Sequence, residues 1–190
     1  MAHHPVLLQE VLTGLALRPG ARVLDATVNR GGHARALCEA IGPEGQLIAL
    51  DADENALREA EQNLLTAPGQ KIFIKGNFRN LTTLLAVRNL NLFDACLFDL
   101  GLSTEQLLTG ERGFSFQFSG PLLMTLSSPP ETGALTAAVI VNDWNEAELF
   151  KIIRDYGEER FARPIAKAIV AARRSQRIST TLELAQLIIE

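Results

Sequence analysis

Val23-Leu24-Asp25-Ala26-Thr27-Val28-Asn29-Arg30-Gly31-Gly32-His33 is the stretch that decides the fold of this chain. An apolar run ends in an acid and a glycine pair then opens a helix, which is typical of the first strand, turn and helix of a nucleotide-binding α/β unit. A second apolar run, Leu47-Ile48-Ala49-Leu50-Asp51, ends in an acid 20 positions after Gly31. At this spacing such folds place a carboxylate on a ribose diol. The glycines let the backbone approach the ligand, and the helix N-terminus supplies free N–H groups.

Four apolar runs alternate with helical patterns along the first half of the chain. This alternation predicts βαβ units and a parallel sheet. Ligands bind at the carboxyl ends of such strands, where Asp25, Asp51 and Asp99 lie. The predicted strands are 22–25, 46–51, 71–75 and 93–99, and the predicted helices are 6–17, 32–41, 55–65 and 81–90.

The pattern changes after Asp99. Residues 100–130 are rich in Gly, Ser, Thr and Pro and are expected to form a long functional loop. The fold class is therefore α/β: a Rossmann-like but incomplete sheet of about four parallel strands with an α-helical cap. We expect a ligand-binding portion at 1–103, and the loop with the helical insertion at 104–190. The periodicity of that second part predicts helices over 134–141, 146–156, 162–175 and 182–190. Thr180 or Thr181, together with Glu183, is expected to begin the last of these helices.

The fourth predicted strand would be a long apolar edge, which favours aggregation. A sheet of this kind normally continues past its fourth strand. Truncation of the chain, cover by a partner such as a second copy in a homodimer, or cover by the chain's own helices would each account for the missing neighbour.

Composition limits the classes of protein to consider. With 190 residues, 47% of them hydrophobic and 21% charged, the chain suits one well-cored domain with a smaller insertion. A net charge of −4 gives no overall attraction to nucleic acid, so RNA contact requires a local basic surface. The candidates for it, with a solvated helix face as the alternative, are Arg154, Arg160, Arg163, Lys167, Arg173, Arg174 and Arg177.

The cysteines Cys38 and Cys96 lie in apolar surroundings without metal-like spacing, which predicts buried free thiols in a reducing compartment. Because the cysteines lack metal-like spacing, no metal is expected. No stretch reaches the length of a membrane span and no signal peptide opens the chain, so no membrane association is expected. The cytoplasm is the expected location, with an organelle matrix as the alternative.

Further motifs follow one another from the first residues to the last. They resemble those of the ribosomal RNA small subunit methyltransferase H family. The resemblance implies a class I methyltransferase fold, S-adenosyl-L-methionine as cofactor, and methylation of N4 of a cytidine in small-subunit (16S-type) rRNA, with that rRNA or the ribosomal subunit as partner. The motifs are His4-Pro5-Val6-Leu7-Leu8-Gln9-Glu10-Val11-Leu12, Asp25-Ala26-Thr27 with Arg30-Gly31-Gly32-His33, Gly76-Asn77-Phe78, Phe98-Asp99-Leu100-Gly101 with Ser103, Gln106-Leu107, Arg112-Gly113-Phe114-Ser115-Phe116 and Tyr156-Gly157-Glu158-Glu159-Arg160.

The resemblance also implies a cofactor site. Without it, Phe78 would be interpreted as an ordinary core aromatic and His33 as a helix-start histidine with a local hydrogen bond. The implied cofactor residues are Gly31, Gly32 and His33 at the methionine end, Asp51 at the ribose, Phe78 at the adenine, and Asp99 and Gln106 on and after the fourth strand.

Asp99 is also the candidate catalytic residue. An exocyclic amine conjugated with its ring is a poor nucleophile, so its methylation requires an oriented lone pair and an acceptor for an amine proton. A carboxylate at a strand tip can hold that proton or orient the cofactor. A carboxylate that caps the following loop is the alternative.

The segment 112–116 pairs a cation with two aromatics in a loop. Such a group can stack a splayed base, as recognition of single-stranded RNA requires. Arg112, Phe114 and Phe116 are therefore candidate substrate-binding residues, with a hydrophobic plug that seats the loop on the sheet as the alternative.

The chain departs from the family pattern at Asn29, where the family has glycine, and in the loop 119–127. The family's Asp-Gly-Pro-Leu-Asp-Met-Arg-Met-Asp is Ser-Gly-Pro-Leu-Leu-Met-Thr-Leu-Ser here, so three acids and an arginine are replaced. Family members continue for roughly another hundred residues, a domain-scale block, so a shortened relative or a fragment is expected. These differences predict weak turnover, and a non-catalytic relative that binds cofactor, RNA or a protein partner is the alternative function.

Overall fold

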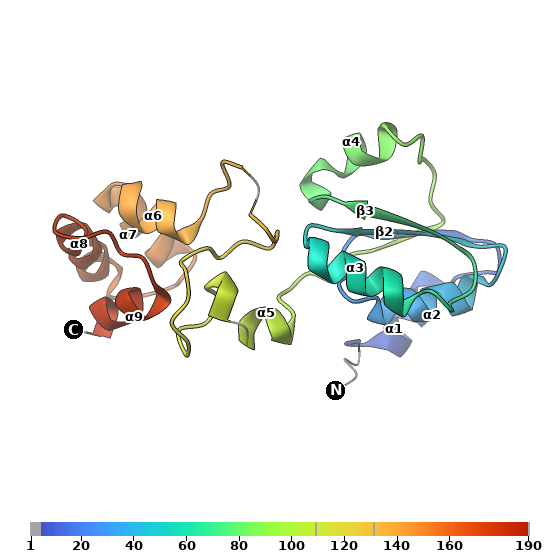
Figure 1. Ribbon diagram of the computed structural model, residues 1–190, viewed down its shortest axis with the longest axis horizontal. Helices are drawn as coiled ribbons and strands as arrows, with labels where there is room; N and C mark the ends of the chain where they lie inside the picture. The colour runs from blue at the N-terminus through green and yellow to red at the C-terminus, as the bar shows by residue number, and fades with distance from the viewer. Residues whose placement is uncertain (1–4, 109, 131, 190) are drawn as a thin grey trace. The chain divides into compact units, whose positions relative to one another are not determined.

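The computed structural model describes residues 5–108, 110–130 and 132–189 and forms two compact units (Figure 1). The sheet unit is Met1–Gly101 with Leu126–Pro129, and the helical unit is Leu102–Thr125 with Pro130–Glu190. His4, in the first motif, lies outside the described residues.

The sheet unit contains a four-stranded parallel sheet, which confirms the predicted fold class. The order is β3-β2-β1-β4. Within the described residues β4 pairs only with β1 and over three residues, so it is shorter than the predicted 93–99. The other three strands are confirmed to within one residue. The strands are β1 Arg22–Asp25, β2 Gln46–Asp51, β3 Gln70–Lys75 and β4 Ala95–Leu97.

Helices follow or precede the strands as the alternation predicted. The helix from Gly32 is confirmed at both ends, whereas the first and fourth helices are shorter than predicted. The first one is bounded by left-handed backbone at Leu7 and Ala16. The helices of the sheet unit are α1 Leu8–Leu15, α2 Gly32–Ile41, α3 Glu54–Asn63 and α4 Leu81–Ala86, with a 3-10 turn η1 Phe78–Asn80.

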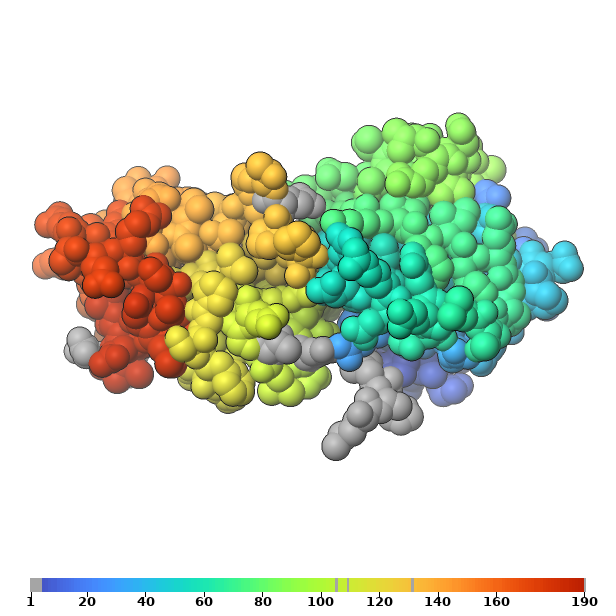
Figure 2. Space-filling view, viewed as in Figure 1, coloured from blue at the N-terminus to red at the C-terminus, as the bar shows by residue number. Residues whose placement is uncertain are grey.

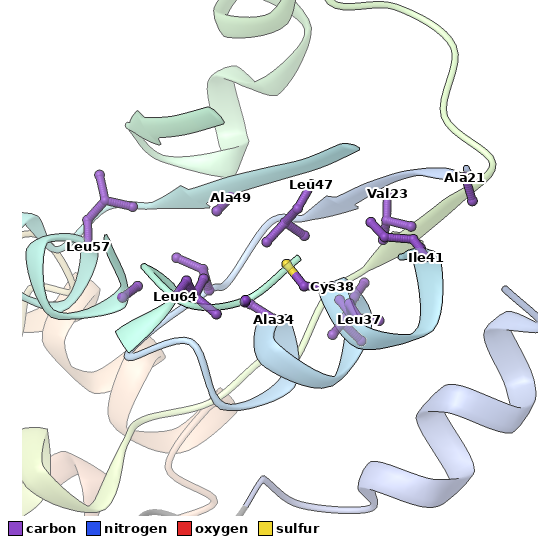
Figure 3. Packing of buried hydrophobic residues seen from close by; sticks show 14 residues of the cluster. Ala21, Val23, Ala34, Leu37, Cys38, Ile41, Leu47, Ala49, Leu57 and Leu64 are labelled. Atoms are coloured by element: carbon purple, nitrogen blue, oxygen red, sulfur yellow. The ribbon is translucent and has the colours of Figure 1, made fainter. Parts of the chain in front are cut away.

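Both faces of the sheet are buried at its central strands, which explains why β1 and β2 are apolar runs. On one face Val23 and Leu47 pack against Leu37, Cys38 and their neighbours on α2 (Figure 3). Successive residues alternate between the faces. The opposite face carries Leu24, Ile48, Leu50 and Ile74, which pack with Leu85 of α4.

Cys38 is buried as predicted, but Cys96 is exposed, so the prediction for Cys96 was wrong. Cys96 pairs in register with Leu24 and therefore belongs to the face that α4 covers. The six-residue α4 lies over β3 (Figure 1), at the edge of the sheet opposite to β4. Strand order thus leaves the thiol uncovered.

The helical unit packs around Leu122, Val141, Leu149 and Ile169. Three of its helices start with reciprocal caps, Ser103 with Gln106, Asn145 with Glu148 and Thr180 with Glu183. Residues 100–130 were predicted as a loop, and the short helix and 3-10 turn within them correct that prediction. No helix of the described residues is long and apolar enough to cross a membrane. The elements are α5 Thr104–Leu108, η2 Gly110–Arg112, α6 Ala137–Asp143, α7 Glu146–Asp155, α8 Ala162–Ala172 and α9 Thr181–Ile189.

Candidate functional site

The turn between β1 and α2 requires left-handed backbone at two positions. Gly31, the N-cap of α2, has φ +85°, and its N–H donates to the carbonyl of Val28 at 2.8 Å. Asn29 has φ +48°. Glycine adopts this region freely and asparagine tolerates it better than most other residues, so the turn persists although the family's glycine is absent at position 29.

The glycine pair also lets other parts of the chain approach. A Cβ on Gly31 would lie 3.3 Å from Cγ of Leu64, and one on Gly32 would lie 3.0 Å from Cγ of Pro5. The pair therefore has a packing role in addition to any role at a ligand. The sequence pattern did not reveal this packing role, because Pro5 and Leu64 are distant along the chain.

Asp51, at the end of β2, holds the glycine turn in place. Its Oδ2 accepts from the Asn29 N–H at 2.8 Å and its Oδ1 accepts from the Asp53 N–H at 2.9 Å. Burial raises the pKa of Asp51 above its ordinary value, and these two N–H groups oppose the rise. A carboxylate offers about four lone-pair sites, so Asp51 can still accept from a vicinal diol beside these backbone N–H groups.

Asp99 and His33 meet beside the same turn. His33 Nδ1 lies 3.5 Å from Asp99 Oδ2, and its Nε2 lies 3.0 Å from the Val6 carbonyl oxygen. The predicted alternative of a local hydrogen bond at His33 was wrong, because Val6 is 27 positions away. The Asp99 N–H donates to Thr27 Oγ1 at 2.7 Å, and the Asp99 side chain is 52% exposed. A carboxylate is thus held at the strand tip while one side remains open.

Asp25 brings a third carboxylate to this edge of the sheet. Its Oδ1 accepts from the Thr27 N–H at 3.1 Å. Burial raises the pKa of Asp25 to about 7, and the nearby Asp51 and Asp99 add to the rise. The sequence placed Asp25 at a strand end but showed neither its burial nor its titration near neutrality.

Phe78 and Phe98 form an aromatic pair at the carboxyl ends of β3 and β4. Their ring centroids lie 6.0 Å apart with an interplanar angle of 87°. Since β3 and β4 are opposite edges of the sheet, this contact joins loops that start from opposite edges. Phe78 is 38% exposed and Phe98 is 44% exposed, so the interpretation of Phe78 as a core aromatic was wrong. Phe98 was missed, although an aromatic beside a strand-end acid was a usable signal.

The remaining candidates belong to the helical unit, so the structure does not group them with the residues above. Gln106 forms a reciprocal cap on α5: its Oε1 accepts from the Ser103 N–H at 3.0 Å, and its N–H donates to Ser103 Oγ at 3.2 Å. In the loop 112–116, Phe116 is 70% exposed, whereas Arg112 and Phe114 are half-buried.

The loop 119–127 keeps a defined backbone despite its changed side chains. The carbonyl of Gly120 accepts from the Thr181 N–H at 2.9 Å, and the carbonyl of Leu123 accepts from the Ala137 N–H at 3.0 Å. A Cβ on Gly120 would overlap the Gly110 carbonyl oxygen, so glycine is required there. The described residues contain no group of three or more side chains suited to a metal ion.

The parallel sheet, the glycine turn at the start of α2 and the acids at the strand ends define a Rossmann-like nucleotide-binding unit. The chain belongs to the MraW methylase family, whose model matches residues 1–190. It is 44% identical to a ribosomal RNA small subunit methyltransferase H of Symbiobacterium thermophilum, over 98% of this chain and 58% of that protein. For the protein of the same name from Thermomicrobium roseum the values are 47%, 98% and 56%. The chain thus spans less than two thirds of the length of these relatives, and the predicted family is confirmed.

Proposed function

We propose that this chain is the cofactor-binding part of an S-adenosylmethionine-dependent methyltransferase that acts on N4 of a cytidine in small-subunit rRNA. The observation that supports it most is the convergence of the glycine turn, Asp51 and the His33–Asp99 contact at one edge of the sheet. The names of the relatives supply the substrate class.

The donors and acceptors at this edge fit such a cofactor. The first N–H groups of α2, from Gly32 onward, have no intrahelical partner and suit the cofactor's carboxylate. The spare lone pairs of Asp51 suit the ribose diol. The partly exposed rings of Phe78 and Phe98 suit an adenine face. When bound, the sulfonium supplies the methyl group.

Asp99 has the catalytic role in this proposal. Its carboxylate accepts a hydrogen bond from the amine N4, which aligns the nitrogen lone pair, and it holds the proton that N4 releases when the N–CH3 bond forms. Thr27 and His33 fix the backbone and one carboxylate oxygen of Asp99, so the other oxygen faces the substrate. We also propose that Gln106 contacts the cofactor and that Arg112, Phe114 and Phe116 contact the RNA.

We also propose that the protein is located in the cytoplasm and forms a homodimer in which the second copy covers the edge strand β4 and Cys96. Light scattering of the purified chain tests the dimer, because a monomer mass at all concentrations contradicts it.

Calorimetry with S-adenosylmethionine tests the cofactor assignment. We expect binding by the wild-type chain and at least a tenfold weaker affinity for Asp51→Asn, because the amide offers one acceptor oxygen where the carboxylate offers two. Glu61→Gln, which changes an exposed acid on α3, is the matched control and is expected to bind like wild type. Equal heats for Asp51→Asn and the control would contradict the assignment.

A further inference from the structure

The segment 160–177 of the helical unit contains six cations and no acid, in a chain whose net charge is −4. Two of the six are engaged within the protein. Arg173 donates to the Val141 carbonyl at 2.7 Å, and Arg177 pairs with Asp143 at 3.1 Å. The other four, Arg160, Arg163, Lys167 and Arg174, are exposed, and we call them the α8 stripe.

The α8 stripe extends over α8 and both of its ends: Arg163 and Lys167 lie on the helix, Arg160 two residues before it and Arg174 two residues after it. Ala162, Ala166 and Ile169 form the buried side of this helix. Arg163 and Lys167 are four residues apart and so share a face of the helix. The orange-red surface of Figure 2 contains this segment. Within the part of the chain that the structure describes, none of the four cations forms an ion pair.

Aromatic rings hold two of these guanidinium groups in place. The Arg163 guanidinium lies 4.7 Å from the centroid of the Phe150 ring, and that of Arg160 lies 4.6 Å from the centroid of the Phe161 ring. An aromatic ring accepts no conventional hydrogen bond from a guanidinium that lies over its face, so the N–H groups stay available for phosphate oxygens. Stacking also lowers the entropy lost when a ligand binds.

Three acids precede the stripe, and two of them are engaged elsewhere; the third, Glu158, is exposed two residues before Arg160 and offsets part of the charge there. Asp155 pairs with Arg154 at 2.7 Å, which is why Arg154 is not part of the stripe. Glu159 accepts from the Phe161 N–H at 2.7 Å and is thereby turned toward the backbone. The stripe therefore presents a cluster of exposed positive charges on α8 and just beyond its two ends.

We propose that the α8 stripe binds the phosphate backbone of the RNA substrate. The identity of this partner rests on the proposed function. The positive charge, its clustering around α8 and the guanidinium groups held over aromatic rings suit a sequence-independent contact with phosphates. The overall negative charge of the chain gives no attraction to RNA, so RNA binding requires a local basic surface. The stripe is such a surface.

Salt-dependent binding of a fluorescent single-stranded oligouridylate tests the proposal. We compare the wild-type chain with R160Q/R163Q/K167Q/R174Q by anisotropy at several KCl concentrations. The slope of log K against log salt should become shallower by about 3, since each lost phosphate contact removes ~0.7 for a single strand. The matched control R18Q/R58Q/K75Q/R88Q removes four exposed charges from the sheet unit and should keep the wild-type slope.

Equal slopes for the stripe variant and the control would overturn the proposal. It would also be overturned if the quadruple variant lost binding to phosphatidylserine vesicles but bound the oligouridylate like the wild-type chain. The double variants R160Q/R163Q and K167Q/R174Q should each remove about half of the effect, and they replace the quadruple variant if circular dichroism shows it unfolded. Calorimetry with S-adenosylmethionine should give wild-type heats for every variant. If the wild-type chain does not bind S-adenosylmethionine, the proposed function is contradicted. The salt slopes still decide independently whether the stripe binds RNA.

Discussion

Nδ1 of His33 lies 3.5 Å from Oδ2 of Asp99, while Nε2 of the same ring lies 3.0 Å from the Val6 carbonyl oxygen. A carbonyl can only accept, so Nε2 carries a hydrogen. The contact with Asp99 is then attractive only when Nδ1 carries a proton as well, because a lone pair there would face the carboxylate. One buried ring thus ties the start of the chain to the acid at the tip of the fourth strand.

Replacement of His33 separates these two contacts. His33→Ala removes both and should lower the free energy of unfolding by about 1–3 kcal/mol, because the Val6 carbonyl loses its donor. His33→Gln can still donate to Val6 but cannot carry a charge toward Asp99, so we expect roughly half of that loss. Urea denaturation measures both values. Equal losses for the two variants would show that the bond to Val6 contributes nothing.

Asp25 should make stability depend on pH. Its pKa is raised from 3.8 to about 7 in the folded chain, so between these values the folded state holds a proton that the unfolded state has released. Stability is therefore highest below about pH 4 on this account and falls as pH rises to about 7. The full effect is about 4 kcal/mol, since one pKa unit corresponds to ~1.4 kcal/mol.

Asp25→Asn removes this titration and keeps an acceptor for the Thr27 N–H. The stability of the variant relative to wild type should rise between pH 4.5 and 7.5, which urea denaturation across that range measures. Asp51 also has a raised pKa and stays in both proteins, so its contribution cancels in the difference. Parallel curves for the two proteins would contradict the burial of an ionisable group at position 25.

Gly31→Ala should destabilise the glycine turn. The backbone at Gly31 has φ +85°, and the added Cβ would lie 3.3 Å from Leu64 Cγ, so we expect a loss of about 1–3 kcal/mol. Gly14→Ala is the matched control, because a Cβ at this position of α1 meets nothing within 4 Å. A helix-interior glycine replaced by alanine should gain ~0.5–1 kcal/mol. Changes of the same sign in thermal unfolding would contradict the assigned backbone at Gly31.

Restoring charge to the loop 119–127 should raise methyl transfer. The loop keeps its backbone hydrogen bonds, so S119D/L123D/T125R returns the family's groups to a retained frame. We expect little incorporation of labelled methyl into small-subunit RNA by the wild-type chain and at least tenfold more by the variant, because a base edge regains paired partners. Gln117→Glu adds a charge nearby and serves as control. High incorporation by the wild-type chain would show that the missing acids are not required.

Local pattern was enough to predict much of this protein. The apolar runs predicted β1, β2 and β3; the central strands β1 and β2 are mostly buried, since strands covered on both faces favour apolar residues, whereas the edge strand β3 has one fully buried residue, Ile74. The glycine turn and the caps at Thr180 and Glu183 were also predictable, because a turn or a cap depends on residues a few positions apart. The acids at the strand ends followed from the same runs.

Tertiary structure alone decided which of these groups meet and which are covered. Strand order leaves Cys96 exposed on the edge strand and brings Phe98 against Phe78 from the opposite edge. Packing decides that Asp25 is buried and titrates near neutrality, and that His33 bonds to a carbonyl 27 residues away. These properties depend on contacts between distant residues and on exclusion of water, which local periodicity along a chain does not encode.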